Sequence, residues 1–223
     1  MATFCEVLRR RAQRSIFLDE KEISPTIGDH VVVEVDGEVD IGRVVWKGGG
    51  EAMESAVQER GCVIRKACAE DIDAYAIRQQ KETAAVEVFR QKISEHQLPM
   101  KTVDVEYEKD GSRITFYFTA PKRVDFRKLV RDLARIYHTR IELRQINPRQ
   151  EAQRLGGFGV CGRPLCCASF IQRLHPVSAH SVRNQSLSQN LSRLVGACGQ
   201  LKCCLRYESD ADGEDGEGYS RGE

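Results

Sequence analysis

Six of the nine cysteines lie between residues 161 and 204, and they form two copies of one pattern. Each copy is a Cys-Gly pair, three further residues and two adjacent cysteines, and the copies are offset by 37 residues. An aromatic residue stands three positions after each cysteine pair, at Phe170 and Tyr207. A repeat this detailed predicts that the thiols act as a set. The candidate metal ligands are Cys161, Cys166, Cys167, Cys198, Cys203 and Cys204.

Thiolates are soft ligands, which favour zinc, copper(I) or an iron–sulfur cluster. A zinc site and a [4Fe–4S] cluster each take four protein ligands. Six cysteines therefore exceed one site and fall short of two. Either each adjacent pair divides between a ligand and a buried or bridging thiol, or a partner subunit supplies the missing ligands. His175 and His180 could substitute, although surface or packing histidines are the favoured interpretation.

Two other interpretations of the repeat stay open beside metal binding, which is favoured. A thiol-redox protein would use a low-pKa cysteine beside Arg163, with a resolving cysteine next to it. A purely structural role would bury all six thiols as small hydrophobic side chains. The remaining cysteines, Cys5, Cys62 and Cys68, stand singly and are interpreted as packing residues.

The net charge of +1 hides a strong polarity along the chain. Residues 121–208 carry 16 basic and five acidic residues, whereas residues 1–120 and the tail 209–223 are both net acidic. Such a basic region indicates an anionic partner, either nucleic acid or an acidic protein face, unless the acidic half of the same chain neutralises it. The candidate contact residues are Arg127, Lys128, Arg131, Arg135, Arg140, Arg144 and Arg163.

The sequence offers no catalytic constellation, and we predict a protein that is not an enzyme. The serines at 186, 188 and 192 have no His–Asp pair nearby, and no glycine-rich nucleotide fingerprint is present. The run Gly156-Gly157-Phe158-Gly159 could hold a phosphate, but a flexible approach to the first cysteine loop is favoured. Without a visible signal peptide or membrane span, we expect a cytoplasmic protein with no membrane insertion.

The elements that position these residues predict an α+β fold. Residues 1–60 are typical of a small β-barrel-like domain, with a first strand over Phe4 to Arg10. An Asp-Gly turn joins a hairpin of His30–Val35 and Glu38–Trp46. The glycine-rich run from Lys47 to Gly50 predicts a flexible loop.

Residues 61–155 predict an α+β sandwich. A long helix over 70–97 has two apolar patches, one around Tyr75 and one around Phe89. A β-hairpin follows, then an amphipathic helix from Asp125, its predicted N-cap, to His138, and a strand over 139–145. An Asn-Pro pair at 147–148 can open a short helix. The cysteine-rich segment 156–208 is expected to pack on this domain, and the acidic tail 209–223 to be disordered.

The chain resembles the bacterial RicT (YaaT) family, whose C-terminal domain is shared with a yeast polymerase-suppressor protein. The resemblance covers most of residues 1–208 and is specific, because the doubled Cys-Gly-x3-Cys-Cys pattern is uncommon. It rests on four stretches, Val124 to Arg127, Thr139 to Ile146, Leu155 to Cys167 and Gly196 to Glu208.

This resemblance implies a subunit of a complex with two small helical proteins of the YlbF and YmcA types. That complex carries [4Fe–4S] clusters, is associated with a flavin (FAD), and assists a membrane-anchored endoribonuclease in RNA maturation. Through RNA maturation it influences sporulation, competence and biofilm formation. The resemblance therefore implies an iron–sulfur regulatory adaptor whose cluster ligands come from the six repeat cysteines. A zinc-stabilised nucleic-acid-binding module is the alternative.

Overall fold

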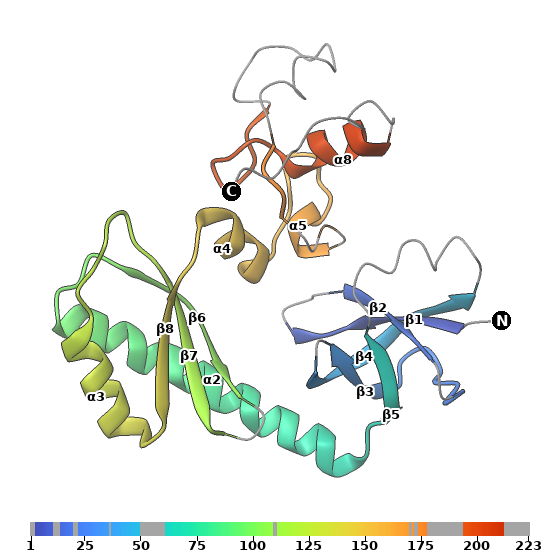
Figure 1. Cartoon of the computed structure of the whole chain (residues 1–223), viewed down its shortest axis with the longest axis horizontal. Helices are drawn as coiled ribbons and strands as arrows, with labels where there is room; N and C mark the ends of the chain where they lie inside the picture. The colour runs from blue at the N-terminus through green and yellow to red at the C-terminus, as the bar shows by residue number, and fades with distance from the viewer. Residues whose placement is uncertain are drawn as a thin grey trace, which may run out of the picture. The chain divides into compact units, whose positions relative to one another are not determined.

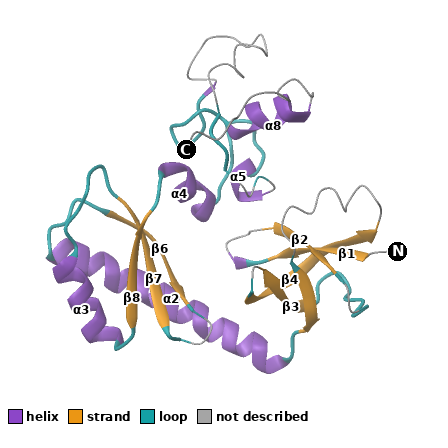
Figure 2. Cartoon of the chain, in the orientation of Figure 1, coloured by secondary structure: helices purple, strands orange, loops and turns teal. Residues whose placement is uncertain are grey.

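The computed structural model describes residues 3–10, 14–19, 22–35, 37–49, 61–108, 111–169, 171, 174–177 and 194–211. The chain divides into two compact units, residues 1–147 and residues 148–223. The fold is α+β, as the sequence predicts (Figure 1, Figure 2). Within the described residues, no helix is both long enough and apolar enough to cross a membrane.

A closed five-stranded barrel begins the first unit, with the strand order β1-β2-β5-β3-β4. The predicted hairpin is confirmed, with Val35 opposite Glu38. Alternate side chains fill the barrel interior, among them Val7, Phe17 and Val44, as expected for strands with one buried face. The strands are β1 (Thr3–Leu8), β2 (Arg14–Leu18), β3 (His30–Val35), β4 (Glu38–Gly49) and β5 (Cys62–Lys66).

Two features of the barrel differ from the sequence prediction. Residues 47–49 of the expected flexible loop are instead the end of β4, because Thr3 and Phe4 of β1 pair with Gly49 and Gly48, and Gly50 lies outside the described residues. Gly48 is required there because a Cβ atom would collide with the Trp46 ring. The fifth strand, β5, lies after residue 60, so the barrel extends past the boundary drawn from the sequence.

The rest of the first unit follows the predicted order of helix, hairpin, helix and strand. The three-stranded sheet has the order β6-β7-β8, and β8 runs parallel to β7. The α3 helix begins two residues after Asp125, whose carboxylate still accepts the Arg127 backbone N–H at 3.1 Å. The elements are α2 (Ala69–Glu95), β6 (Lys101–Tyr107), β7 (Arg113–Thr119), α3 (Arg127–Tyr137) and β8 (Arg140–Gln145).

Helices α2 and α3 bury their apolar residues in one core with the sheet. Phe89 of α2 lies against Phe116 of β7, with ring centroids 4.7 Å apart, and Leu129 of α3 is buried in the same cluster. The predicted helix is one continuous element, and in its first half Ile72 and Ala76 are exposed while Tyr75 is half-buried. That half of the helix precedes the residues that reach the sheet, so it has no apolar layer to pack against.

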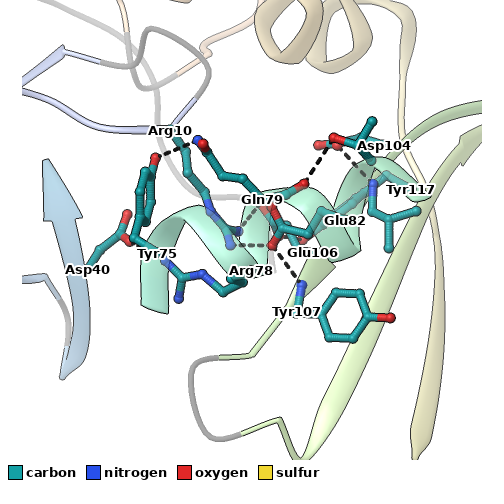
Figure 3. Close-up of polar contacts among 12 residues, drawn as sticks. Arg10, Asp40, Tyr75, Arg78, Gln79, Glu82, Asp104, Glu106, Tyr107 and Tyr117 are labelled. Carbon is teal, nitrogen blue, oxygen red and sulfur yellow. Dashed lines mark hydrogen bonds and ion pairs between the residues drawn. The ribbon is translucent and has the colours of Figure 1, made fainter. Parts of the chain in front are cut away.

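A buried ion pair connects the barrel to α2 (Figure 3). Arg10, which follows β1, donates a hydrogen bond to Glu82. The same Glu82 oxygen accepts the backbone N–H of Tyr107 at 3.0 Å. A second pair joins Arg78 of α2 to Asp40 of β4 at 3.2 Å. Because Glu82 is almost fully buried on a helix face that is otherwise mostly exposed, its partners compensate its loss of hydration.

The second unit contains α4 (Pro148–Leu155), α5 (Cys166–Ser169) and α8 (Cys203–Ala211). The first of these confirms the helix predicted at the Asn-Pro pair. The last continues to Ala211, three residues into the segment predicted to be disordered, and residues 212–223 lie outside the described chain. That the cysteine-rich segment packs on the preceding domain stays a prediction.

Candidate metal centre

The two copies of the cysteine pattern fold into the same loop. We call residues 157–168 the first loop and residues 194–205 the second loop. A single β-bridge closes each, Phe158 with Pro164 and Val195 with Leu201. Four backbone hydrogen bonds of the first loop, at 2.8–3.0 Å, recur 37 residues later in the second loop, at 2.8–3.2 Å. The sequence repeat is therefore a structural repeat.

The glycine after the leading cysteine is fixed by the turn. Gly162 has a φ of 74° and Gly199 a φ of 72°, both in the left-handed region that side chains with a Cβ rarely adopt. No heavy atom lies within 4 Å of where a Cβ would be at either position, so conformation rather than space selects glycine.

The loops bring cysteines of both copies together. The thiol of Cys167 is hydrogen-bonded to the sulfur of Cys203, which joins the first loop to the second. Cys166 also lies within the electrostatic influence of second-loop cysteines. The sulfurs that act on Cys166 or Cys167 are those of Cys161, Cys198, Cys203 and Cys204. Each of the other predicted cysteines thus lies within electrostatic range of Cys166 or Cys167, and the role of the six as metal ligands stays a prediction.

Equivalent cysteines in the two loops have opposite acidities. The pKa of Cys166 is raised to about 11, first by burial and then by the neighbouring sulfurs. The pKa of Cys203, at the equivalent position, is lowered by the hydrogen bond from Cys167 and by the positive charge of Arg149. The pKa of Cys167 is correspondingly raised. Thiolate character therefore concentrates on Cys203, and a thiolate is the form that binds metal.

The six thiols differ in exposure. Cys167 is buried and Cys161 is exposed, while the other four are half-buried. The alternative in which all six are buried as small hydrophobic side chains therefore does not describe the structure. A partly exposed thiol cluster is accessible to a metal ion or to an oxidant.

The six cysteines of the two loops match a metal site in their chemistry but not fully in their arrangement. The chemistry fits, because soft thiolates from two loops converge and one of them has a lowered pKa. The arrangement is less complete, since no group of three or more His, Cys, Asp or Glu side chains in the described part of the chain is placed to hold a metal ion. The structure thus presents thiols in contact across two loops without a closed ligand shell.

The single cysteines divide between burial and exposure. Cys5 is fully buried inside the barrel, and this burial raises the pKa of its thiol. Cys62 is half-buried. The prediction that Cys68 is a packing residue is wrong, because it is exposed and precedes α2, where its thiol contacts Asp71 at 3.0 Å.

The predicted basic contact residues fall in two places. Those of the first unit are exposed along α3 and β8: Arg127, Lys128, Arg131, Arg135, Arg140 and Arg144. Arg144 also pairs with Glu142 at 3.1 Å and lies 6.0 Å from the Tyr117 ring centroid. Arg163 is exposed in the first loop of the second unit. The backbone carbonyl of His175 accepts a hydrogen bond, and His180 lies outside the described residues.

Arg149 is the residue that sequence reasoning missed. Its buried guanidinium donates to the carbonyl oxygens of Leu201 at 2.8 Å and His175 at 3.1 Å. It therefore anchors the second loop to α4 and also places a positive charge near Cys203. Only its position just after the Asn-Pro helix start marks it in the sequence, and nothing local distinguishes it from the other arginines.

Two family models match the chain. The PSP1 C-terminal conserved region matches residues 61–146, and the third domain of PSP1-like proteins matches residues 176–214. The stage 0 sporulation protein YaaT of Bacillus subtilis is 45% identical over 182 residues, which is 81% of this chain. The chain belongs to the RicT (YaaT) family. The resemblance drawn from the cysteine repeat is thereby confirmed.

The matches cover only part of the length of these relatives. The match spans 66% of the length of the Bacillus protein. An uncharacterized protein of Schizosaccharomyces pombe is 31% identical over 150 residues, which is 55% of this chain and 20% of that protein. No solved structure gives a significant match.

Proposed function

We propose that this chain is a regulatory protein whose two cysteine loops hold an iron–sulfur cluster. The hydrogen bond between Cys167 and Cys203 carries the proposal, because it joins thiols of loops whose equivalent cysteines are 37 residues apart in sequence. The lowered pKa of Cys203 supplies thiolate at neutral pH, which an iron or zinc ion requires. The name of the Bacillus relative supports a role in regulating sporulation.

The family resemblance supports a more specific role in RNA maturation. We propose that the protein acts as a non-enzymatic adaptor in endoribonuclease-dependent RNA maturation, together with YlbF- and YmcA-type helical partners. The exposed basic residues of α3 and β8 are the proposed contact surface for RNA or for an acidic partner. A partner that completes the ligand shell is compatible with the absence of a three-ligand group among the described side chains. The flavin implied by the family stays a prediction.

Metal analysis after anaerobic purification tests the cluster. We expect iron and acid-labile sulfide bound to the full chain, together with thiolate-to-iron charge-transfer absorbance. Cys203→Ser and Cys167→Ser should each lose most of this absorbance. Cys68→Ser is the matched control, because this exposed thiol lies outside the loops and should leave metal content unchanged. A wild-type chain that is colourless and iron-free, alone and with its partners, would overturn the proposal.

Two alternatives have their own signatures. A zinc-stabilised module predicts stoichiometric zinc and no iron, with RNA affinity that falls steeply with salt. A thiol-redox protein is favoured by the same contact between Cys167 and Cys203, because a low-pKa thiol beside a second thiol is the arrangement such proteins use. It predicts a Cys167–Cys203 disulfide under mild oxidation, detectable by mass spectrometry, in a chain that binds no metal.

A further inference from the structure

The tip of the first loop exposes more apolar surface than its role in holding thiols requires. Phe158 is 75% exposed and Val160 84% exposed, and Leu155 at the end of α4 is 61% exposed. These three lie within six residues, whereas the other large exposed apolar residues of the described chain are scattered over several elements. Contiguous exposed apolar side chains of this kind mark interaction sites.

The backbone on either side of Phe158 is held in place, and the Phe158 side chain is largely exposed. Its backbone is fixed on both sides, by the Leu165 N–H donating to Gly157 at 3.0 Å and the Gly159 N–H donating to Arg163 at 2.8 Å. Because both flanking residues are glycines, no adjacent side chain shields either face of the ring. Two glycines of the run that the sequence predicts to be a flexible approach, Gly157 and Gly159, thus take part in the hydrogen bonds of the loop itself.

The second loop lacks this surface although its backbone is the same. Val195 occupies the position of Phe158 and is half-buried, and Ala197 occupies that of Val160. Gln200 replaces Arg163. The exposed ring and its neighbouring cation are therefore properties of the first loop and are not needed for the turn itself.

The segment that contains the first loop is basic in sequence. Residues 148–211 carry eight basic and three acidic residues. Arg163 is exposed, and it forms no ion pair within the described chain. Phe158 is 75% exposed, and exposed Arg163 lies across the loop from Gly159, the residue after Phe158, so the same hairpin carries an exposed ring and an exposed cation. A nucleobase stacks on such a ring, and its phosphate pairs with such a cation.

We propose that the tip of the first loop is a stacking platform for single-stranded nucleic acid, in which a base stacks on Phe158 and Arg163 pairs with a neighbouring phosphate. This inference rests on the proposed role in RNA maturation and adds to it a base-stacking contact in the second unit, distinct from the basic residues of α3 and β8. It is separate from the cluster, because neither residue is a thiol.

Fluorescence anisotropy with labelled 12-nucleotide rU and rA tests the platform on the full-length protein. Phe158→Leu keeps an apolar side chain but removes the ring, and it should weaken binding by roughly 5- to 150-fold. Phe158→Tyr keeps the ring and should bind within about twofold of wild type. Arg163→Gln copies the residue of the second loop, and it should weaken binding of both oligomers and reduce the salt slope by about one. Tyr207→Leu, at an exposed aromatic on α8, is the matched control.

The outcomes separate this inference from the proposed function. Equal binding by wild type and Phe158→Leu overturns the platform, as does wild-type protein that binds neither oligomer. Loss of an interaction with a protein of the complex in the Phe158→Leu variant, with RNA binding unchanged, identifies apolar protein docking and also overturns it. Metal content is measured on each variant. A metal-loaded chain that binds no RNA would refute the platform alone, and a metal-free chain with Phe158-dependent RNA binding would refute the cluster alone.

Discussion

The first and second cysteine loops have the same backbone and different surroundings. Their bridges and hydrogen bonds match at an offset of 37 residues, yet the first presents an exposed Phe158 and the second packs Leu194 and Leu205 into a small apolar cluster. The equivalent cysteines Cys166 and Cys203 have pKa values shifted in opposite directions. The two loops therefore share a backbone, whereas the acidity of each thiol depends on burial, on sulfurs of both loops and, at Cys203, on Arg149.

The largest expected difference between the loops is in stability. Leu205→Ala gives the second loop the residue that the first has at Ala168, and it removes a buried side chain from the cluster with Leu194. We expect a loss of about 2–3 kcal/mol in the free energy of local opening, because large-to-small changes leave a cavity. Hydrogen exchange of residues 194–211 measures it. Ile77→Ala, at an exposed position on α2, should change little. An equal loss of hydrogen-exchange protection in the first loop would contradict the expectation that the Leu194–Leu205 cluster stabilises mainly the second loop.

Removal of the Arg149 anchor should affect the second loop more than the first. Arg149→Met leaves the carbonyls of Leu201 and His175 without their donor, which costs about 1–3 kcal/mol. It also removes the charge that lowers the pKa of Cys203, so the pKa should rise. Chemical denaturation and the pH dependence of Cys203 alkylation measure the two effects. If Arg149→Met lowers the stability but leaves the pH dependence of Cys203 alkylation unchanged, Arg149 does not lower the pKa of Cys203.

The two turn glycines should respond equally. Gly162→Ala and Gly199→Ala each force a Cβ-bearing residue into the left-handed region, at a cost of about 1–2 kcal/mol. Because neither Cβ would meet another atom, conformational strain should be the whole effect. Thermal denaturation measures the stability of both variants. Gly156→Ala is a useful third case, because Gly156 has a similar φ of 70° but lies outside both loops. Strongly unequal costs would show that the loops are less alike than their backbones indicate.

The smallest expected effect is on the pH dependence of thiol reactivity. In metal-free protein, Cys203 should be alkylated by iodoacetamide at lower pH than Cys166, whose pKa is raised to about 11. The depressed pKa of Cys203 stabilises the folded state above the ordinary thiol pKa, and this contribution is lost as the pH falls through its folded value. The contribution of Cys166 to stability has the opposite sign. Its raised pKa destabilises the folded state as the pH rises from about 9 towards 11. Peptide mapping resolves the two cysteines, and coincident profiles would remove the distinction.

Much of the fold could be predicted because its signals are local. The Asp-Gly hairpin of the barrel, the alternation in β6 and β7 and the apolar stripe of α3 all depend on neighbours within a few residues. The missed features depend on distant pairing. The end of β4 is a strand only because β1 lies beside it, and the anchor at Arg149 is made by carbonyls of residues 175 and 201.

By itself the sequence determined that six thiols form two copies of one turn, because the glycine and the cysteine spacing act within seven residues. The tertiary structure decided which sulfur carries negative charge and which loop buries apolar side chains. Arg149 reaches Leu201 across 52 positions of sequence, and Cys167 reaches Cys203 across the two loops. Electrostatic and packing energies depend on distance in space, so a pattern that repeats along the chain does not repeat in its chemistry.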